Sequence, residues 1–122
     1  MFNPTANQWS SRPFSHGPGN RSVAALVPHP YLSTKVVLLF GEKSPSSDGH
    51  NAAGNFWSDI WIYDYPKDTW ELAELENAHL LVDGGVGWTA AAVNNKTKEI
   101  IVWGGLNNRN ERIGNAWKLT LN

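Results

Sequence analysis

The sequence feature that most constrains the fold is a stretch of strand and turn signals, residues 36–70, that returns in shortened form nearer the C-terminus. An apolar run ends at Gly41 and a polar loop follows. Residues 59–64 then alternate, with Ile60, Ile62 and Asp64 on one side and aromatic residues on the other, and a turn leads to Trp70. Runs of Val, Ile, Trp and Tyr bounded by Gly, Pro, Asp and Ser are typical of strands separated by turns. The stretch therefore predicts three strands of one small antiparallel sheet.

The chain carries a second, partial copy of this pattern. Residues 87–93 parallel residues 22–27, residues 99–105 parallel residues 36–41, and residues 114–119 parallel residues 58–63. Residues 4–9 in turn resemble residues 66–70, which indicates the end of a preceding repeat with Trp9 in a short strand. We expect essentially no helix, and strands near residues 22–27, 36–40, 59–64, 70–75, 88–93, 99–103 and 115–120.

Composition narrows the class of protein. The 122 residues are 41% apolar and 17% charged, which is enough to bury a core in one domain. Seven tryptophans are unusual for this length and favour packing between repeats. A formal net charge of −1 provides no basic field, so nucleic acid and anionic membranes are not expected partners.

Cysteine usage and hydropathy indicate the compartment. The chain has no cysteine, so neither a disulfide framework nor a thiolate site can form. The N-terminal residues lack the apolar segment of a secretory signal, and no segment approaches the length of a membrane span. We expect a soluble, cytoplasmic protein.

The order of the segments carries a resemblance to a known repeat. A strand of small residues, an apolar strand ending in glycine, a loop, a strand with Asp and aromatic residues, and a Trp strand resemble kelch repeats of about 50 residues. The resemblance covers the chain from Trp9 to Leu121. It implies an all-β fold of kelch-type β-propeller blades, a partial propeller of about two four-stranded antiparallel blades. It also implies structural repeat positions at Trp9, Gly41, Trp61, Tyr63, Trp70, Gly104, Gly105 and Trp117.

The resemblance divides the chain into three units. Residues 1–18 are expected to be the end of a preceding blade and a linker, residues 19–76 a complete blade, and residues 77–122 a second, incomplete blade. Propellers close with typically four to eight blades, so two arrangements stay open. The chain belongs to a longer propeller, or three copies close a ring of six blades in which the strand around Trp9 supplies the missing fourth strand.

A closer likeness lies in the loops. Their motifs resemble the C-terminal blades of the nitrile-specifier and epithiospecifier-like kelch proteins of plants and their fungal relatives: Gly41-Glu42, Pro45-Ser46, Gly49-His50, Ala53-Gly54-Asn55-Phe56, Gly87-Trp88 and Asn110-Glu111-Arg112. Some plant members steer glucosinolate breakdown with ferrous iron, through a Glu-x-x-x-Asp-x-x-x-His motif. This sequence has no such spacing, so no iron residue is carried over and no cofactor is expected.

Several residues are candidates for binding a ligand or partner. Glu42, Asp48 and His50 lie within nine residues and could together hold a divalent ion, although such residues in a Gly- and Ser-rich loop usually satisfy turn hydrogen bonds. Arg21 starts an inner strand where the second copy has Val86, and it faces either a central channel or a structural partner. Trp88, whose counterpart in the first copy is Val23, and Arg112, in a polar loop, complete the set. Trp57, Trp61, Trp103 and Trp117 are expected to pack between blades.

These features favour a binding role over catalysis. No orienting group or oxyanion donor accompanies His50 and the nearby hydroxyl of Ser47, so no catalytic residue is assigned. We expect a scaffold that binds another protein, the missing blades of the propeller or a small molecule. The alternative is part of a specifier-like propeller that shapes a small-molecule pocket, with its reactive and iron-binding residues outside this chain. A purely structural role is the third reading.

Overall fold

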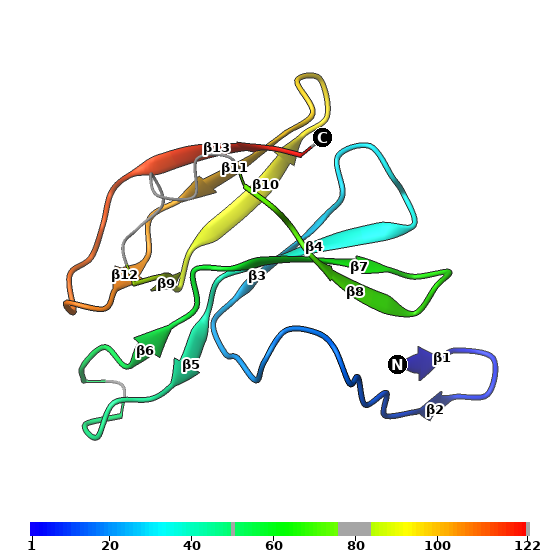
Figure 1. The fold of residues 1–122 in the computed structure, drawn as a ribbon, viewed down its shortest axis with the longest axis horizontal. Helices are drawn as coiled ribbons and strands as arrows, with labels where there is room; N and C mark the ends of the chain where they lie inside the picture. Colours follow the sequence, from blue (N-terminus) through cyan, green and yellow to red (C-terminus); the bar gives the residue numbers. More distant parts are fainter. Residues whose placement is uncertain (50, 76–83, 122) are drawn as a thin grey trace.

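Two small antiparallel sheets organise the fold (Figure 1). The computed structural model describes residues 1–49, 51–75 and 84–121, and these residues form strands without any helix. Sheet 1 has the order β3 (Ala25–Pro28), β4 (Lys35–Leu39), β7 (Ile60–Asp64), β8 (Thr69–Leu72). Sheet 2 has the order β10 (Ala90–Asn94), β11 (Glu99–Trp103), β13 (Ala116–Thr120). The seven strands predicted from the sequence are confirmed, with boundaries shifted by up to three residues.

Six further strands are present, and of these only the short strand at Trp9 was predicted. They form three short pairs: β1 (Phe2–Asn3) with β2 (Gln8–Trp9), β5 (Glu42–Ser44) with β6 (Asn55–Phe56), and β9 (Val86–Gly87) with β12 (Leu106–Asn107). The sequence predicted a loop over residues 41–56, and the structure corrects this at both ends of that segment. Strands of two or three residues are too short to display a polarity period, so their pairing follows from the longer strands that they extend.

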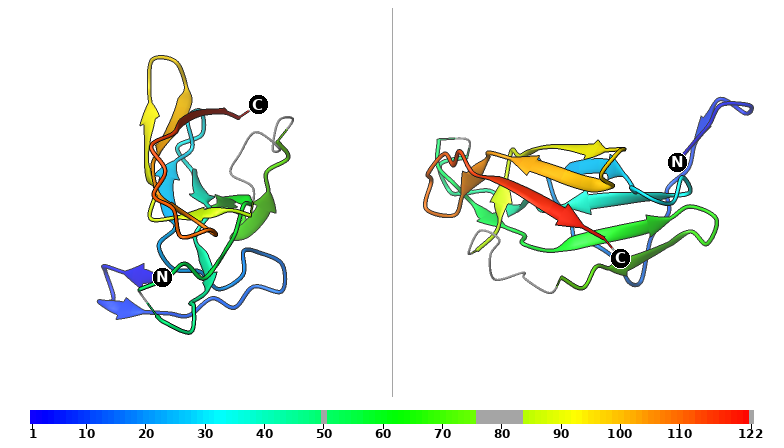
Figure 2. Two further views of the ribbon diagram at one scale, coloured as in Figure 1. Left: turned by 90° about the vertical axis from the view of Figure 1, so that its left-hand side faces the viewer. Right: turned by 90° about the horizontal axis from the view of Figure 1, so that it is seen from above.

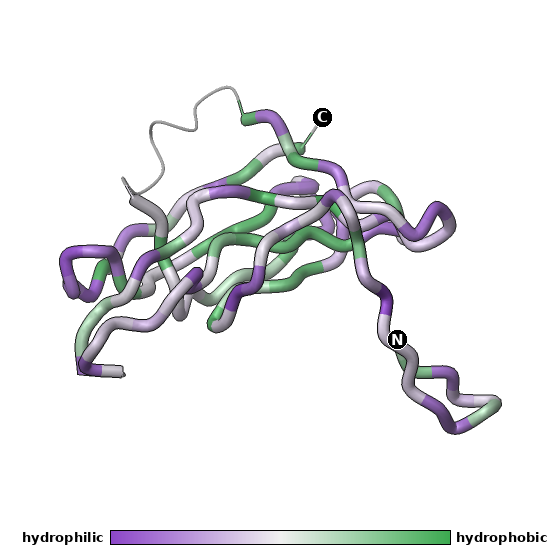
Figure 3. Tube along the Cα trace, turned by 60° about the horizontal axis from the view of Figure 1, so that its bottom comes forward, coloured by the Kyte–Doolittle hydropathy of each residue, from purple (hydrophilic) through white to green (hydrophobic). Residues whose placement is uncertain are grey.

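The core lies between the two sheets, which face each other with β10 beside β3 (Figure 2). Val37, Leu39 and Ile60 of sheet 1 are fully buried against Ile100 and Val102 of sheet 2. Apolar residues therefore follow the strands, and polar residues gather in the connections (Figure 3). The opposite face of each sheet points away from the core, because side chains alternate along a strand.

The two sheets repeat the same backbone conformations. Phe40 and Gly41 have φ values of 56° and 109°, and Gly104 and Gly105 have 67° and 119°. A Cβ on Gly41 would lie 2.8 Å from the carbonyl oxygen of Ser22, and a Cβ on Gly105 would lie 2.7 Å from that of Gly87. Glycine is therefore required at both positions, and Ser22 corresponds to Gly87. The likeness between the two copies thus extends to individual residues.

The N-terminal hairpin β1–β2 repeats the hairpin β7–β8. The rings of Phe2 and Trp9 lie 5.1 Å apart at 43°, and those of Tyr63 and Trp70 lie 5.0 Å apart at 44°. Both pairs face each other across their strands. The expected turn and short strand at Trp9 are confirmed, and this hairpin stands away from both sheets (Figures 1 and 2).

Candidate functional site

Most of the predicted binding residues gather at one end of the two sheets, the end that carries β5–β6 and β9–β12 (Figure 1). We call this region the loop end; in the described part of the chain it comprises residues 41–49, 51–57, 84–88 and 105–113. Glu42 lies in β5, Asp48 in the turn that follows, Trp88 directly after β9, and Arg112 opposite Leu106 of β12. His50 lies outside the described residues.

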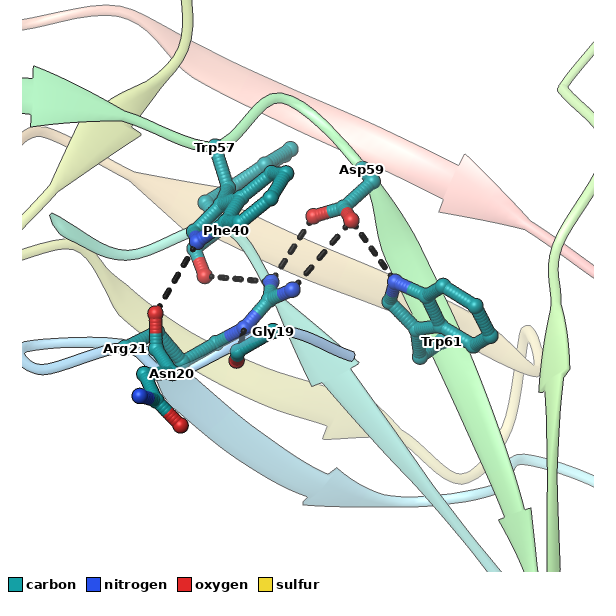
Figure 4. A network of polar contacts seen from close by, with 7 residues as sticks. All are labelled: Gly19, Asn20, Arg21, Phe40, Trp57, Asp59 and Trp61. Atoms are coloured by element: carbon teal, nitrogen blue, oxygen red, sulfur yellow. Dashed lines mark hydrogen bonds and ion pairs between the residues drawn. The ribbon is translucent and has the colours of Figure 1, made fainter. Parts of the chain in front are cut away.

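Arg21 is part of a buried polar network rather than of the surface (Figure 4). Its guanidinium donates to both carboxylate oxygens of Asp59, at 2.7 and 3.2 Å, and to the carbonyl oxygen of Phe40 at 2.9 Å. Only 5% of the Arg21 side chain is exposed. Of the two predicted surroundings, a channel or a structural partner, the structure has the structural partner. The geometry therefore gives no support to Arg21 as a ligand-binding residue.

Tryptophans complete this network. The indole Nε1 of Trp61 donates to Asp59 at 2.7 Å, and that of Trp57 donates to the carbonyl oxygen of Asn20 at 3.2 Å (Figure 4). The Trp57 ring also lies 5.0 Å from the guanidinium of Arg21 and 4.7 Å from the ammonium of Lys43. These contacts were missed in the sequence analysis. Arg21, Trp57 and Asp59 occur in the first repeat only, and this shared difference between the repeats would have been a signal.

Glu42 is buried, with 8% of the residue exposed. Its backbone exchanges hydrogen bonds with Ser22 at 2.8 and 3.0 Å, and its carboxylate accepts from the Ser22 hydroxyl at 3.4 Å. A Cβ on Gly54 would lie 2.8 Å from Glu42 Oε1, so the carboxylate lies against the returning strand of the hairpin. Glu42 thus links β5 to the segment that leads into β3, and its carboxylate is turned inward.

Asp48 lies in a tight turn on the surface. Gly49 donates its N–H to the carbonyl of Ser46 at 3.1 Å, and the Ser46 hydroxyl donates back to the carbonyl of Gly49 at 3.0 Å. Such bonds are the ordinary role of polar loop residues. Within the described ranges no three His, Cys, Asp or Glu side chains are grouped to hold a metal ion.

Trp88 is the exposed aromatic residue of the loop end. It is 42% exposed, its φ is 55°, and its N–H donates to the carbonyl of Val23 at 3.0 Å. Val23, its predicted counterpart in the first repeat, has a φ of 50°. The ring of Trp88 meets that of Phe56 edge to face, with centroids 6.1 Å apart. Val23 thus fixes the backbone of Trp88, and Phe56 packs against its indole.

The polar loop before Arg112 is ordered by Asn107. This residue is only 3% exposed, and its side-chain oxygen accepts from the N–H groups of Arg109 and Glu111 at 3.0 Å each. Its amide nitrogen donates to the Glu111 carboxylate at 2.9 Å. That hydrogen bond, followed by the charge of Arg109, lowers the pKa of Glu111 below its usual value. Arg112 itself is exposed beside this hydrogen-bonded turn.

The structural tryptophans fall into two groups. Trp117 packs against the core between the sheets, as predicted, and Trp61 is buried with 8% exposed. Trp103 is 59% exposed and Trp9 is 81% exposed, so neither is packed within this chain. Trp103 is exposed because its face of sheet 2 points away from sheet 1. Trp61 lies outside the core cluster between the sheets, and its ring centroid is 5.3 Å from that of His16 in the N-terminal segment.

A groove of about 730 Å³ lies between sheet 1 and β13 and was not predicted. Its apolar lining includes Ile62, Leu75, Trp117 and Leu119. Charge is contributed by Glu71, Glu74 and Lys118. The groove is formed by residues distant in sequence, so no local sequence pattern could predict it.

The fold and its surfaces define an all-β protein of paired antiparallel sheets, and comparison with known proteins agrees at that level. No family model matches the chain, and no curated protein matches it. Among solved structures, the structure of YjhT is similar with a TM-score of 0.62 and 23% identity over 87% of this chain and 25% of that one. The chain thus spans about a quarter of the length of YjhT. At this identity the likeness concerns the fold alone.

Among the described residues, none belongs to a helix of the length and hydropathy needed to cross a bilayer.

Proposed function

We propose that this chain is part of a kelch-type β-propeller and acts as a scaffold that binds another protein, without catalytic chemistry of its own. The repeated plan of the two sheets supports the first part. Sheet 2 reproduces the first three strands of sheet 1, with the same glycine turn at Gly41 and Gly105. In a propeller such sheets are blades around an axis. The proposed units are residues 1–18, 19–76 and 77–122.

The binding role rests on the exposed indole of Trp88 and on the positive φ of its backbone. A bulky residue with positive φ is rare, and residues held in such conformations concentrate at functional sites. Val23 has the same backbone conformation, so the turn belongs to the repeat, whereas the exposed indole is specific to sheet 2. Rigid, exposed aromatic residues are frequent anchors of protein interfaces.

The surroundings of Trp88 suit an interface. Gly87, its neighbour, pairs with Leu106, and Leu106 bridges to Arg112. Trp88 therefore follows one strand of this short sheet and Arg112 bridges to the other, so the sheet connects an exposed indole with an exposed cation. Interfaces commonly combine a central aromatic residue with a polar, charged rim. We infer that the partner surface offers an apolar pocket flanked by carboxylates.

The test compares two exposed aromatic residues at opposite ends of the paired sheets. A partner captured by the chain is identified, purified and titrated against the wild type, Trp88→Ala and Tyr31→Ala; Tyr31 is 54% exposed in the connection from β3 to β4. We expect Trp88→Ala to weaken binding about tenfold or more and Tyr31→Ala to leave it unchanged.

Two results would redirect the proposal. Equal binding by wild type and Trp88→Ala would exclude the loop end as the contact surface. A changed product from an activated thioglucoside on addition of the chain would instead favour the specifier-like alternative.

A further inference from the structure

The groove beside β13 corresponds to the place in sheet 1 that holds Trp70. Phe40 donates its N–H to the carbonyl of Asp59 at 3.1 Å, and Gly104 donates to that of Asn115 at 3.0 Å, so β13 begins as β7 does. Asp59 and Asn115 are therefore equivalent positions, and Tyr63 and Leu119, each four residues later, are equivalent as well. Tyr63 pairs with Trp70 of β8, whereas in the described part of the chain no strand pairs with the outer edge of β13.

The walls of the groove also match the surroundings of Trp70. The ring of Phe14 lies 6.4 Å from Trp70 and 6.1 Å from Tyr63. Phe14 follows Trp9 by five residues, as Leu75 follows Trp70. Leu75 and Leu119 both line the groove. Sheet 2 thus offers the apolar contacts that Trp70 has in sheet 1, beside a strand edge that is unpaired among the described residues.

The chain also carries a tryptophan suited to this place. Trp9 is 81% exposed on β2, and its hairpin has the cross-strand ring geometry of the hairpin that carries Trp70. Only two residue pairs join β1 to β2. A hairpin of two strands is marginally stable in water, so the exchange of β1 for another strand costs little. The hairpin points away from β13 of its own chain (Figure 2).

We propose that β2 of a second copy of this chain leaves β1 and pairs with β13, with Trp9 seated in the groove opposite Leu119. In this exchange β13 replaces β1 as the pairing partner of β2, because β1 and β13 each occupy the position that β7 occupies beside β8. The pairing is therefore antiparallel, in the register of Tyr63 with Trp70, and Lys118 comes opposite Ser10. This self-association goes beyond the scaffold role and does not depend on the loop end.

The same association covers two exposed apolar faces. Residues 10–20 lead from β2 onto the outward face of sheet 1, so the second copy brings that face against the outward face of sheet 2. Leu26, 60% exposed, then approaches Trp103, 59% exposed. Leu26 of sheet 1 corresponds to Ala91 of sheet 2, and Trp103 of sheet 2 corresponds to Leu39 of sheet 1. Ala91 and Leu39 already pack in the core between the two sheets of one chain. The contact between copies repeats the contact between sheets, and a head-to-tail contact of this kind generates a ring or a filament.

The test measures the association constant by sedimentation equilibrium for the intact chain. We expect a discrete oligomer that Trp9→Ala weakens about tenfold or more. Trp88→Ala, which removes an exposed tryptophan outside the groove, should leave the association unchanged, and this separates the inference from the proposed function. Phe2→Ala should leave it unchanged or strengthen it, because β1 is displaced.

Cysteine cross-linking tests the register. The chain has no native cysteine, so Ser10→Cys with Lys118→Cys creates one candidate pair. Residues opposite each other in antiparallel strands have the spacing that a disulfide requires. We expect disulfide-linked oligomers from this pair and none from Ser10→Cys with Lys96→Cys, in the turn between β10 and β11. A monomer, or an oligomer insensitive to Trp9→Ala, overturns the proposal.

Discussion

Arg21 and Asp59 illustrate how a single residue position is decided by its neighbours. A buried charge is unfavourable unless it is paired and hydrogen-bonded, and Arg21 has a carboxylate, a backbone carbonyl and an aromatic ring within reach. The corresponding positions in sheet 2 are Val86 and Asn115. One repeat therefore uses a charged pair, and the other uses an apolar and a neutral residue.

This comparison predicts strong coupling between the two positions. Arg21→Val should lower the free energy of unfolding by about 3–5 kcal/mol, because it leaves the partly buried Asp59 carboxylate without its cation. The double variant Arg21→Val with Asp59→Asn carries the residues of sheet 2 and should regain most of this loss. Chemical denaturation of the two single variants and the double variant measures the coupling. Simple additivity of the three values would contradict the prediction.

His29 is a buried titratable residue that the sequence did not single out. Burial, followed by the charge of Lys35, lowers its pKa below the usual 6.5. Its Nδ1 accepts from the N–H groups of Tyr31 and Leu32 at 3.2 Å each, which requires the unprotonated nitrogen. The connection between β3 and β4 is therefore closed by a neutral imidazole.

The direction of this shift sets a pH dependence. Below pH 6.5 the unfolded chain binds the proton more readily than the folded one, so stability is full above that pH and falls as the pH drops through the pKa of the folded state. We expect the denaturation midpoint to fall between about pH 7 and about pH 5 more steeply for the wild type than for His29→Asn, whose side-chain oxygen accepts the same bonds. His16→Asn, at an exposed histidine, is the control and should retain the wild-type slope.

At the scale of elements, one hairpin type occurs three times. Asn3, Asp64 and Asn94 each accept from backbone N–H groups of the following turn through their side-chain oxygens. Each turn ends in a residue of positive φ, Asn7, Asp68 or Lys98, at 52°, 54° and 59°. An Asx residue followed by a left-handed residue is a turn that the sequence specifies locally.

The three turns differ in how the left-handed residue is compensated. Asp68 accepts from the hydroxyl of Tyr63 and pairs with Arg12, whereas Lys98 carries the same conformation as a residue that disfavours it. Lys98→Gly should raise the free energy of unfolding by about 0.5–1 kcal/mol, and Asp68→Gly should lower it. Thermal denaturation of both variants provides the comparison, and a loss of stability in Lys98→Gly would contradict this account.

The long strands were predictable because their apolar runs are bounded by turn residues, as in β4 and β11. The short pairs were not, since β5 and β6 are positioned by Gly41, whose carbonyl accepts from Trp57 at 2.8 Å across the chain. Of the site residues, Trp88 was predicted and is exposed, whereas Glu42 and Arg21 are turned inward. A sequence indicates that a polar side chain is present but not which partner surrounds it.

At the scale of the whole molecule, the outward faces of sheets 1 and 2 are the surfaces available for association. Leu26 and Trp103 leave apolar surface on opposite sides of the paired sheets. Exposed apolar faces and open strand edges favour association. The self-association proposed above gives these surfaces and the groove beside β13 a common partner.

Association also predicts a thermal behaviour. If copies bind through Trp9, folding is linked to assembly, and the melting temperature should rise with protein concentration. For Trp9→Ala, whose association is weaker, the same rise should begin only at a protein concentration about tenfold or more higher, and Trp88→Ala should behave as the wild type. Calorimetry over a wide concentration range makes the measurement, and a wild-type melting temperature that does not change would count against assembly.

The sequence by itself determined the all-β class, the seven long strands, the doubled pattern and the glycine turns, because strand periodicity and turn chemistry are local properties of the chain. Only the tertiary structure decided that Arg21 is buried with Asp59, that Trp103 faces outward while Trp117 faces the core, and that Leu75 and Leu119 meet in a groove. These outcomes depend on which faces of two sheets meet, and that pairing joins residues far apart in the chain.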